Sequence, residues 1–266
     1  MKTTVGFIGT GNMGSAIITG LSHRSDVSLL GFDLNRSKLS ALAEDTGLIP
    51  QGSLAELTGN CRYLVLAVKP QHMKPLLGEI GPMLRADQCI ISVAAGIPVK
   101  KLRKWSGEQC PVVRVMPNTP ALVGQGVFAL CLEDPSLSSE QQEMVSGFFT
   151  AQGAVHVLEE RLFDAYTAVI GSGPAYVYYV MEALIEAAVT LGIPRDKALD
   201  MVLGLFKGSV SLASGDEHTV AQLREMVCSP GGSTLAGLNH FDRQAVRGAI
   251  IDGVTLAWKR NRELGD

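Results

Sequence analysis

The sequence predicts an α/β fold class, in which a doubly wound parallel sheet is followed by an all-helical domain. Short β-branched runs alternate with helical patterns through about the first 155 residues, which is typical of parallel strands joined by crossover helices. Near Glu160 the strand pattern stops, and strong helix formers at helical spacing continue from there. We therefore expect an α/β domain over residues 1–158 and a helical domain over residues 159–266.

Each expected strand is a short apolar run, and each expected helix has apolar residues three or four positions apart. Strands are expected at residues 3–8, 27–32, 63–68, 89–93 and 112–116, with 127–131 and 154–158 as further candidates. Helices are expected at residues 13–23, 37–44 and 71–84, from Ser138 or Ser139 onward, and at 162–170, 174–191, 194–213, 219–227 and 235–263.

The composition narrows the class of partner. The chain is 46% hydrophobic and 18% charged, with a mean hydropathy of +0.20, which indicates a large interface between subunits. A net charge of −3 without a basic run argues against nucleic acid. We expect no membrane partner and no apolar stretch long enough to cross a bilayer as a helix. Five scattered cysteines without a C-x-x-C pair favour free thiols in a reducing cytoplasm and no metal site.

A glycine-rich motif follows the first expected strand and opens the first helix. Gly9 permits a tight turn, Gly11 lets a pyrophosphate approach the backbone, and Gly14 allows close packing of helix on strand. This context indicates a Rossmann dinucleotide-binding fold. The cofactor-binding residues predicted from the motif are Gly9, Thr10, Gly11, Asn12, Met13 and Gly14.

The end of the second strand leaves the choice of dinucleotide open. Asp33 lies 19 residues after Gly14, where a carboxylate would accept hydrogen bonds from the ribose hydroxyls of NAD. Asn35 and Arg36, with Ser37 and Lys38 after them, could instead hold the 2′-phosphate of NADP, which Asp33 would repel. The alternative interpretation of these polar residues is an ordinary helix start with solvated charges.

Two later strand ends are expected to face the same cofactor, because ligands of open α/β sheets bind at the carboxyl ends of strands. Asn118 lies on a loop stiffened by Pro120, and we expect it to shape the pocket as one of the cofactor-binding residues. Lys69 could also be only a surface lysine. The predicted contacts at these ends are Ala67, Val68, Lys69, Pro70, Val93, Ala94 and Ala95.

Near the C-terminus the chain reads Ser229-Pro230-Gly231-Gly232-Ser233-Thr234. Two glycines allow close approach of a ligand, and the helix that follows points free N–H groups and a positive dipole end at the same space. The run is suited to binding a carboxylate. It is equally consistent with a helix that is N-capped after a tight turn.

Taken together, these motifs resemble the pyrroline-5-carboxylate reductase family. The segments that carry the resemblance are residues 9–14, 67–71, 92–96, 115–121, 171–176 and 229–234. The resemblance implies a Rossmann domain coupled to a helical dimerisation domain, in a homodimer or a pentamer of dimers. It implies reduction of the C=N bond of 1-pyrroline-5-carboxylate to proline, with NADP(H) favoured and NAD(H) possible. It also implies substrate contacts at Ser233 and Thr234, with Glu160 and Glu217 near the substrate.

Imine reduction needs little acid–base chemistry from side chains, because a protonated C=N already attracts hydride. We predict that the substrate carboxylate is bound by Ser229, Gly231, Gly232 and Ser233. The hydroxyl of Thr234 is the predicted catalytic group, hydrogen-bonded to the ring nitrogen or to the carboxylate. Glu217 could stabilise an iminium or could only anchor its loop.

The chain departs from the family pattern at Ile170, Gly204-Leu205 and Leu54, and Asp33 is unusual for a member that prefers NADPH. The alternatives are a related imine or β-hydroxyacid oxidoreductase and a catalytically silent nucleotide sensor. β-Hydroxyacid dehydrogenases have a catalytic lysine where this chain has Val177, and an alcohol substrate needs such a base. A silent sensor would not need an intact carboxylate pocket.

Overall fold

The computed structural model describes residues 2–215 and 217–265. The chain forms two compact units, one with the residues up to Ser172 and those from Ala257 on, the other spanning Gly173–Leu256. The division into domains of residues 1–158 and 159–266 stays a prediction.

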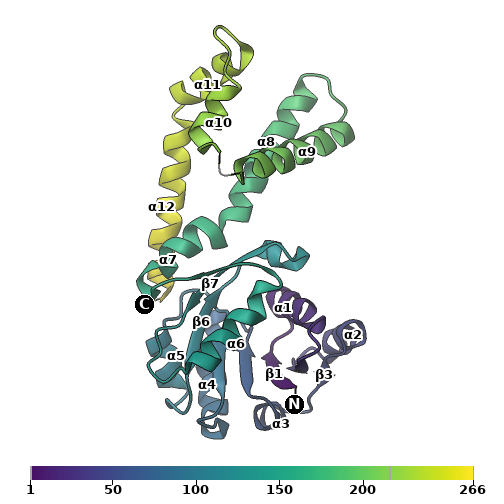
Figure 1. The fold of residues 1–266 in the computed structure, drawn as a ribbon, viewed down its shortest axis with the longest axis vertical. Helices are drawn as coiled ribbons and strands as arrows, with labels where there is room; N and C mark the ends of the chain where they lie inside the picture. The colour runs from purple at the N-terminus through teal and green to yellow at the C-terminus, as the bar shows by residue number, and fades with distance from the viewer. Residues whose placement is uncertain (1, 216, 266) are drawn as a thin grey trace. The chain divides into compact units, whose positions relative to one another are not determined.

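The larger unit contains an eight-stranded sheet with the order β3-β2-β1-β4-β5-β6-β7-β8 (Figure 1). The strands are β1 (Thr3–Ile8), β2 (Val27–Phe32), β3 (Ile49–Pro50), β4 (Tyr63–Leu66), β5 (Cys89–Ser92), β6 (Val112–Met116), β7 (Gly126–Cys131) and β8 (Gly153–Val157). Neighbouring strands run parallel except β6 and β7. These two are joined through a 3-10 turn (Thr119–Val123), a connection too short for a parallel crossover.

Helices cover both faces of the sheet, as a doubly wound fold requires. Alternate residues of the central strands point to opposite faces, so that Val65 of β4 packs in one apolar cluster and Leu64 in the other. The first cluster includes α1 (Asn12–Ser22), α2 (Arg36–Thr46) and α6 (Ser139–Thr150), and the second includes α3 (Leu54–Asn60), α4 (Pro70–Ile80) and α5 (Val99–Trp105). The predicted fold class is therefore confirmed.

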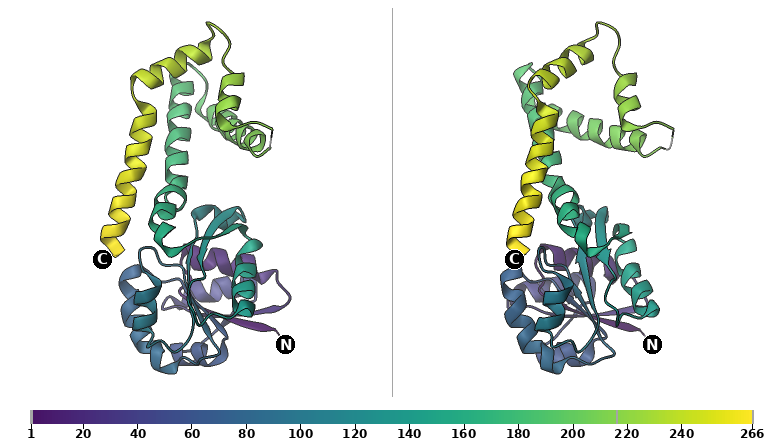
Figure 2. Two further views of the ribbon diagram at one scale, coloured as in Figure 1. Left: turned by 60° about the vertical axis from the view of Figure 1, so that its left-hand side comes forward. Right: turned by 90° about the vertical axis from the view of Figure 1, so that its left-hand side faces the viewer.

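The second unit consists of helices, drawn in green to yellow in Figures 1 and 2. Its helices are α8 (Gly173–Thr190), α9 (Arg195–Ala213), α10 (Val220–Met226), α11 (Ser233–Arg243) and most of α12 (Val246–Gly265). The single helix expected over residues 235–263 is wrong. Ala245 adopts a left-handed conformation with φ of 53°, which ends α11 before α12 begins.

A short irregular stretch precedes α8. It contains a 3-10 turn (Glu160–Leu162), α7 (Phe163–Tyr166) and a π-helical turn (Thr167–Gly171). The π turn is closed by the Ser172 N–H, which donates to the Thr167 carbonyl at 2.8 Å. The helix expected over residues 162–170 is therefore present but irregular, since it passes from 3-10 through α to π geometry.

One expectation about the membrane is also corrected. The helical run Glu160–Thr190 is long and apolar enough to cross a membrane by length and composition, with a mean hydropathy of 1.2. Only 6% of its most apolar window is buried within the chain. Such a helix is weak grounds for a membrane span, because a helix of a subunit interface has the same composition.

Candidate functional site

The glycine motif forms a tight turn between β1 and α1. Gly9 has φ of +96°, and a Cβ atom there would lie 2.8 Å from the Ala67 carbonyl oxygen. A Cβ on Gly14 would collide with the carbonyl oxygen of Gly9. At Gly11 a Cβ would meet nothing within 4 Å, so that this side of the turn is open to a ligand.

The N-terminus of α1 is suited to an anion. Gly11 is the N-cap residue, no side chain caps the helix, and its first turn carries no acid. The N–H groups of the first turn and the positive end of the helix dipole therefore remain available to a phosphate.

Two clefts at the carboxyl edge of the sheet meet at this turn. The first, of ≈ 440 Å³, extends from the turn past the end of β2 to α4, and the second, of ≈ 450 Å³, extends to the end of β5. Both are lined by Gly11, Ala67, Val68 and Lys69. The first cleft also contains Gly9 and Asp33, and the second also contains Asn12, Met13, Pro70, Val93, Ala94 and Ala95.

Sequence reasoning missed much of the first cleft, where Leu54 is predicted only as a departure from the family pattern. Its remaining walls are Ile8, Phe32, Leu34, Leu54, His72, Pro75, Leu76 and Glu79. The sequence offers a weak signal at Leu34, an apolar residue between the polar Asp33 and Asn35, and the structure leaves this side chain 89% exposed. His72 and Glu79 lie on α4, which enters the cleft only because β4 lies beside β1.

Asp33 holds the glycine turn to the end of β2. Its carboxylate accepts the Thr10 N–H at 2.6 Å, the Thr10 hydroxyl at 2.9 Å and the Asn35 N–H at 2.8 Å. Burial raises the pKa of this carboxyl, but the three hydrogen bonds outweigh it and the pKa lies below its usual range. Thr10 is fully buried and bonded to Asp33, and its contact with a cofactor stays a prediction.

Asn35 and Arg36 are both engaged with the protein. The Asn35 side chain accepts the Lys38 N–H as the N-cap of α2. The Arg36 guanidinium lies 4.8 Å from the Phe32 ring centroid and donates to the carbonyls of Gln51 and Gly52, at 2.8 Å each. Their contact with a cofactor stays a prediction.

Asn118 is buried outside the lining of the two clefts. Its Oδ1 accepts the Val127 N–H at 2.9 Å, and its Nδ2 donates to the Ile170 carbonyl at 3.5 Å. A direct cofactor contact by Asn118 stays a prediction.

In the helical unit, residues 229–232 form a type II turn before α11. Gly231 has φ of +72° after Pro230, and the Gly232 N–H donates to the Ser229 carbonyl at 3.0 Å. A Cβ on Gly232 would collide with the Ser229 hydroxyl. No side chain caps α11, so its first N–H groups are available to an anion.

Ser233 and Thr234 begin α11, and both side chains are exposed in the chain. Glu217, near the start of α10, is also exposed. These residues and the Ser229 turn share one unit, and their contact with a substrate stays a prediction.

Glu160 belongs to the other unit, where it is engaged with the protein. Its carboxylate accepts the Val99 N–H at 2.7 Å and pairs with Arg114 at 3.2 Å. Arg114 is 4% exposed, so this ion pair fixes a buried charge of β6. Substrate contact by Glu160 stays a prediction.

Comparisons with known proteins identify the family. A family model described as pyrroline-5-carboxylate reductase dimerisation matches residues 160–264, and one described as NADP oxidoreductase coenzyme F420-dependent matches residues 4–96. The pyrroline-5-carboxylate reductase of Pisum sativum is 37% identical, covering 98% of this chain and 96% of its own. That of Escherichia coli (strain K12) is 32% identical, covering 99% of both chains.

Solved structures agree. Plasmodium falciparum pyrroline carboxylate reductase, crystallised with NADP bound, has a TM-score of 0.90 and 32% identity, covering 99% of this chain and 98% of its own. Mycobacterium tuberculosis 3-hydroxyisobutyrate dehydrogenase, at 14% identity and a TM-score of 0.54 over 77% of this chain and 71% of its own, shares the fold alone. Full-length similarity to named reductases confirms the resemblance seen in the motifs. The chain belongs to the pyrroline-5-carboxylate reductase family.

Proposed function

We propose that this protein reduces the C=N bond of 1-pyrroline-5-carboxylate to give proline, the last step of proline biosynthesis, with NADPH or NADH as the reductant. The observation that carries the proposal is the open cleft around residues 9–14 in a chain related to named reductases over 98% of its length.

The cleft fits a dinucleotide. The turn at Gly9, Gly11 and Gly14 and the uncapped start of α1 would hold a pyrophosphate, and the apolar wall formed by Leu54 and Leu76 would face an adenine ring. When bound, the cofactor supplies hydride. The small residues Ala94 and Ala95 leave room for a flat ring in the second cleft. NADP(H) is favoured, since the related Plasmodium enzyme was solved with NADP.

In the same proposal, the turn at residues 229–232 and the start of α11 bind the substrate carboxylate. The backbone N–H groups of Ser233 and Thr234 would neutralise the anion, as at other helix N-termini. The Thr234 hydroxyl hydrogen-bonds the ring nitrogen or the carboxylate. Glu217 lies in the same unit and is the acid proposed to stand near the iminium.

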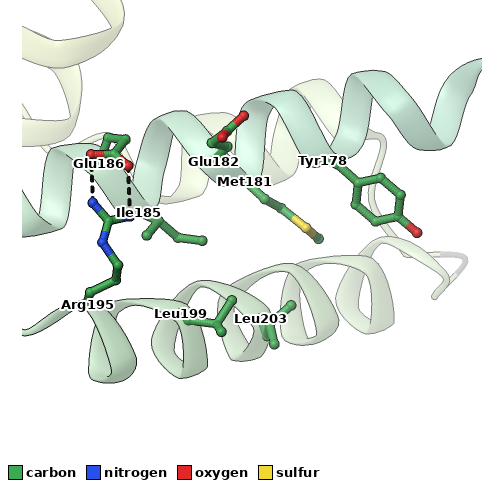
Figure 3. A pocket seen from close by; sticks show the side chains of 8 residues that line it. All are labelled: Tyr178, Met181, Glu182, Ile185, Glu186, Arg195, Leu199 and Leu203. Carbon is green, nitrogen blue, oxygen red and sulfur yellow. Dashed lines mark hydrogen bonds and ion pairs between the residues drawn. The ribbon is translucent and has the colours of Figure 1, made fainter.

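Self-association is supported by the apolar surface of the helical unit and by the dimerisation family model. A groove between α8 and α9 is lined by Tyr178, Met181, Ile185, Leu199 and Leu203, which face one another in Figure 3. The exposed pair of Glu186 and Arg195 closes one end. We propose that a second copy covers these helices, in a homodimer or a pentamer of dimers.

We further propose a cytoplasmic protein without a membrane or nucleic-acid partner. All five cysteines are free, as a reducing compartment favours. Burial raises the pKa of Cys110 and of Cys131 to about 11, so both stay protonated and unreactive at neutral pH.

The test is oxidation of NADPH and of NADH, followed at 340 nm with and without 1-pyrroline-5-carboxylate, with proline measured as product. We expect oxidation that depends on the substrate and forms one proline per NADPH. The proposal fails if neither cofactor is oxidised. For Thr234→Ala we expect a fall in kcat/KM of roughly tenfold or more, and activity within about twofold of the parent would remove Thr234 from a direct role.

A further inference from the structure

Asn118 connects two segments far apart in the sequence. It lies in the loop after β6 and is 6% exposed. Its amide oxygen accepts a hydrogen bond from the Val127 N–H, and its amide nitrogen donates to the Ile170 carbonyl in the π-helical turn. Because the oxygen must face an N–H, the orientation of the amide is fixed by this arrangement.

The Ile170 carbonyl lacks the backbone donor that a regular helix would give it, so the hydrogen bond from Asn118 takes that place. In a regular α-helix it would accept the N–H of the residue four positions later. That residue is Pro174, which has no N–H. The chain accommodates the proline by the π turn, in which the Ser172 N–H reaches back five residues to Thr167. The side chain of Asn118 supplies a donor that the helix lacks.

A second contact joins the same two segments. A Cβ atom on Gly171 would lie 2.9 Å from the Cε atom of Met116, the last residue of β6. Gly171 therefore packs closely against the strand end from which the Asn118 loop begins. Strand β6 pairs with β5, whose carboxyl end opens into the second cleft at Val93–Ala95.

We propose that Asn118 is a positioning residue, which locks the loop after β6 to the π-helical turn at Thr167–Gly171 and does not itself bind the cofactor. The inference rests on the proposed function, since its effect is measured on reduction of 1-pyrroline-5-carboxylate. Both polar ends of the amide are already used within the protein. Its loss would displace the end of β6, which pairs with β5 beside the second cleft, and rates respond to small misplacements more strongly than binding does.

The test compares Asn118→Asp, Pro174→Ala and the double variant. Aspartate keeps the acceptor for the Val127 N–H but replaces the donor to Ile170 by a carboxylate. Alanine at position 174 supplies a backbone N–H, which we expect to bond the Ile170 carbonyl. The readouts are kcat with 1-pyrroline-5-carboxylate and the Kd of NADPH, measured by fluorescence titration.

We expect Asn118→Asp to lower kcat roughly tenfold with the Kd of NADPH within about twofold of wild type. Pro174→Ala alone should stay within about threefold of wild type, and added to Asn118→Asp it should recover most of the lost rate. Asn118→Ala is the second variant and should show the same split between kcat and Kd.

Two results would overturn the inference. A rise in the Kd of NADPH of about tenfold in both Asn118 variants would make Asn118 a cofactor ligand. If the kcat of the double variant is no higher than that of Asn118→Asp, the hydrogen bond from Asn118 to the Ile170 carbonyl is not what maintains the rate. Failure of the proposed function is separate, because the wild-type protein itself would then not oxidise NADPH with this substrate.

Discussion

Gly11 and Gly14 belong to one motif, yet the structure gives them different tasks. A methyl group on Gly14 collides with the Gly9 carbonyl, whereas one on Gly11 projects into open space. We expect Gly14→Ala to lower the free energy of unfolding by about 1–3 kcal/mol, as overpacking does. Gly11→Ala should leave stability within about 0.5 kcal/mol of wild type and weaken NADPH binding by roughly tenfold or more.

Urea unfolding and an NADPH titration on the two variants separate these effects. Equal losses of stability in both variants would contradict the assignment of Gly11 to the ligand side of the turn.

Asp33 gives a prediction about pH. Its folded-state pKa lies below the ordinary value, so its carboxylate stabilises the fold above about pH 4. That contribution is lost as the pH falls through the folded-state pKa. Asn at this position cannot accept all three hydrogen bonds, and we expect Asp33→Asn to be less stable at pH 7 by about 1–3 kcal/mol.

Unfolding of wild type and Asp33→Asn between pH 7 and pH 3 is the measurement. The two unfolding free energies should converge as the pH falls. A difference that stays constant would mean that Asp33 is not ionised and hydrogen-bonded as described.

At the scale of elements, the turn before α11 depends on the left-handed conformation of Gly231. Alanine pays about 1–2 kcal/mol in that region, and asparagine tolerates it better. We expect Gly231→Ala to lower kcat/KM for 1-pyrroline-5-carboxylate roughly tenfold, with a smaller loss for Gly231→Asn and an unchanged Kd for NADPH. Steady-state kinetics with a matched cofactor titration test this, and a wild-type rate for Gly231→Ala would refute it.

Much of the fold and one half of the site followed from local sequence. The strands β1 and β2 match their predicted bounds, and the glycine turn lies where a strand and a helix meet. The helices α3 and α5 were missed because seven residues hold too little of a helical period to detect.

Other features depend on contacts that sequence spacing does not reveal. The left-handed Ala245 ends α11 although alanine disfavours that conformation. The partners of Asn118 lie 9 and 52 residues away in the chain, and the local sequence predicts Asp33 only as a possible ribose ligand. Tertiary contacts, rather than the local pattern, decide the roles of Asn118 and Asp33, whereas Ala245 is exposed and nothing in the structure explains its conformation.

At the scale of the whole molecule, the helical unit buries little of its apolar surface within the chain. Leu199 and Leu203 of the α8–α9 groove are 48% and 49% exposed. We expect Leu203→Lys to shift the protein to a smaller species in sedimentation velocity and to lower activity. NADPH binding should persist, because the residues of both clefts lie in the other unit.

The matched control is Ile49→Lys, which changes a residue of similar exposure on the edge strand β3. It should leave the sedimentation coefficient unchanged. A shift in the control but not in Leu203→Lys would place the interface elsewhere.

The uncapped start of α1 has a consequence for the stability of the protein. A helix end without a side-chain cap leaves N–H groups to water until a phosphate arrives. A dinucleotide bound there acts as a folding ligand, and at about 100 times its Kd it adds about 2.7 kcal/mol to the stability of the native state. The melting temperature should therefore rise with the logarithm of nucleotide concentration. The lifetime of the protein then depends on the concentration of nucleotide as well as on the rate at which the protein itself is turned over.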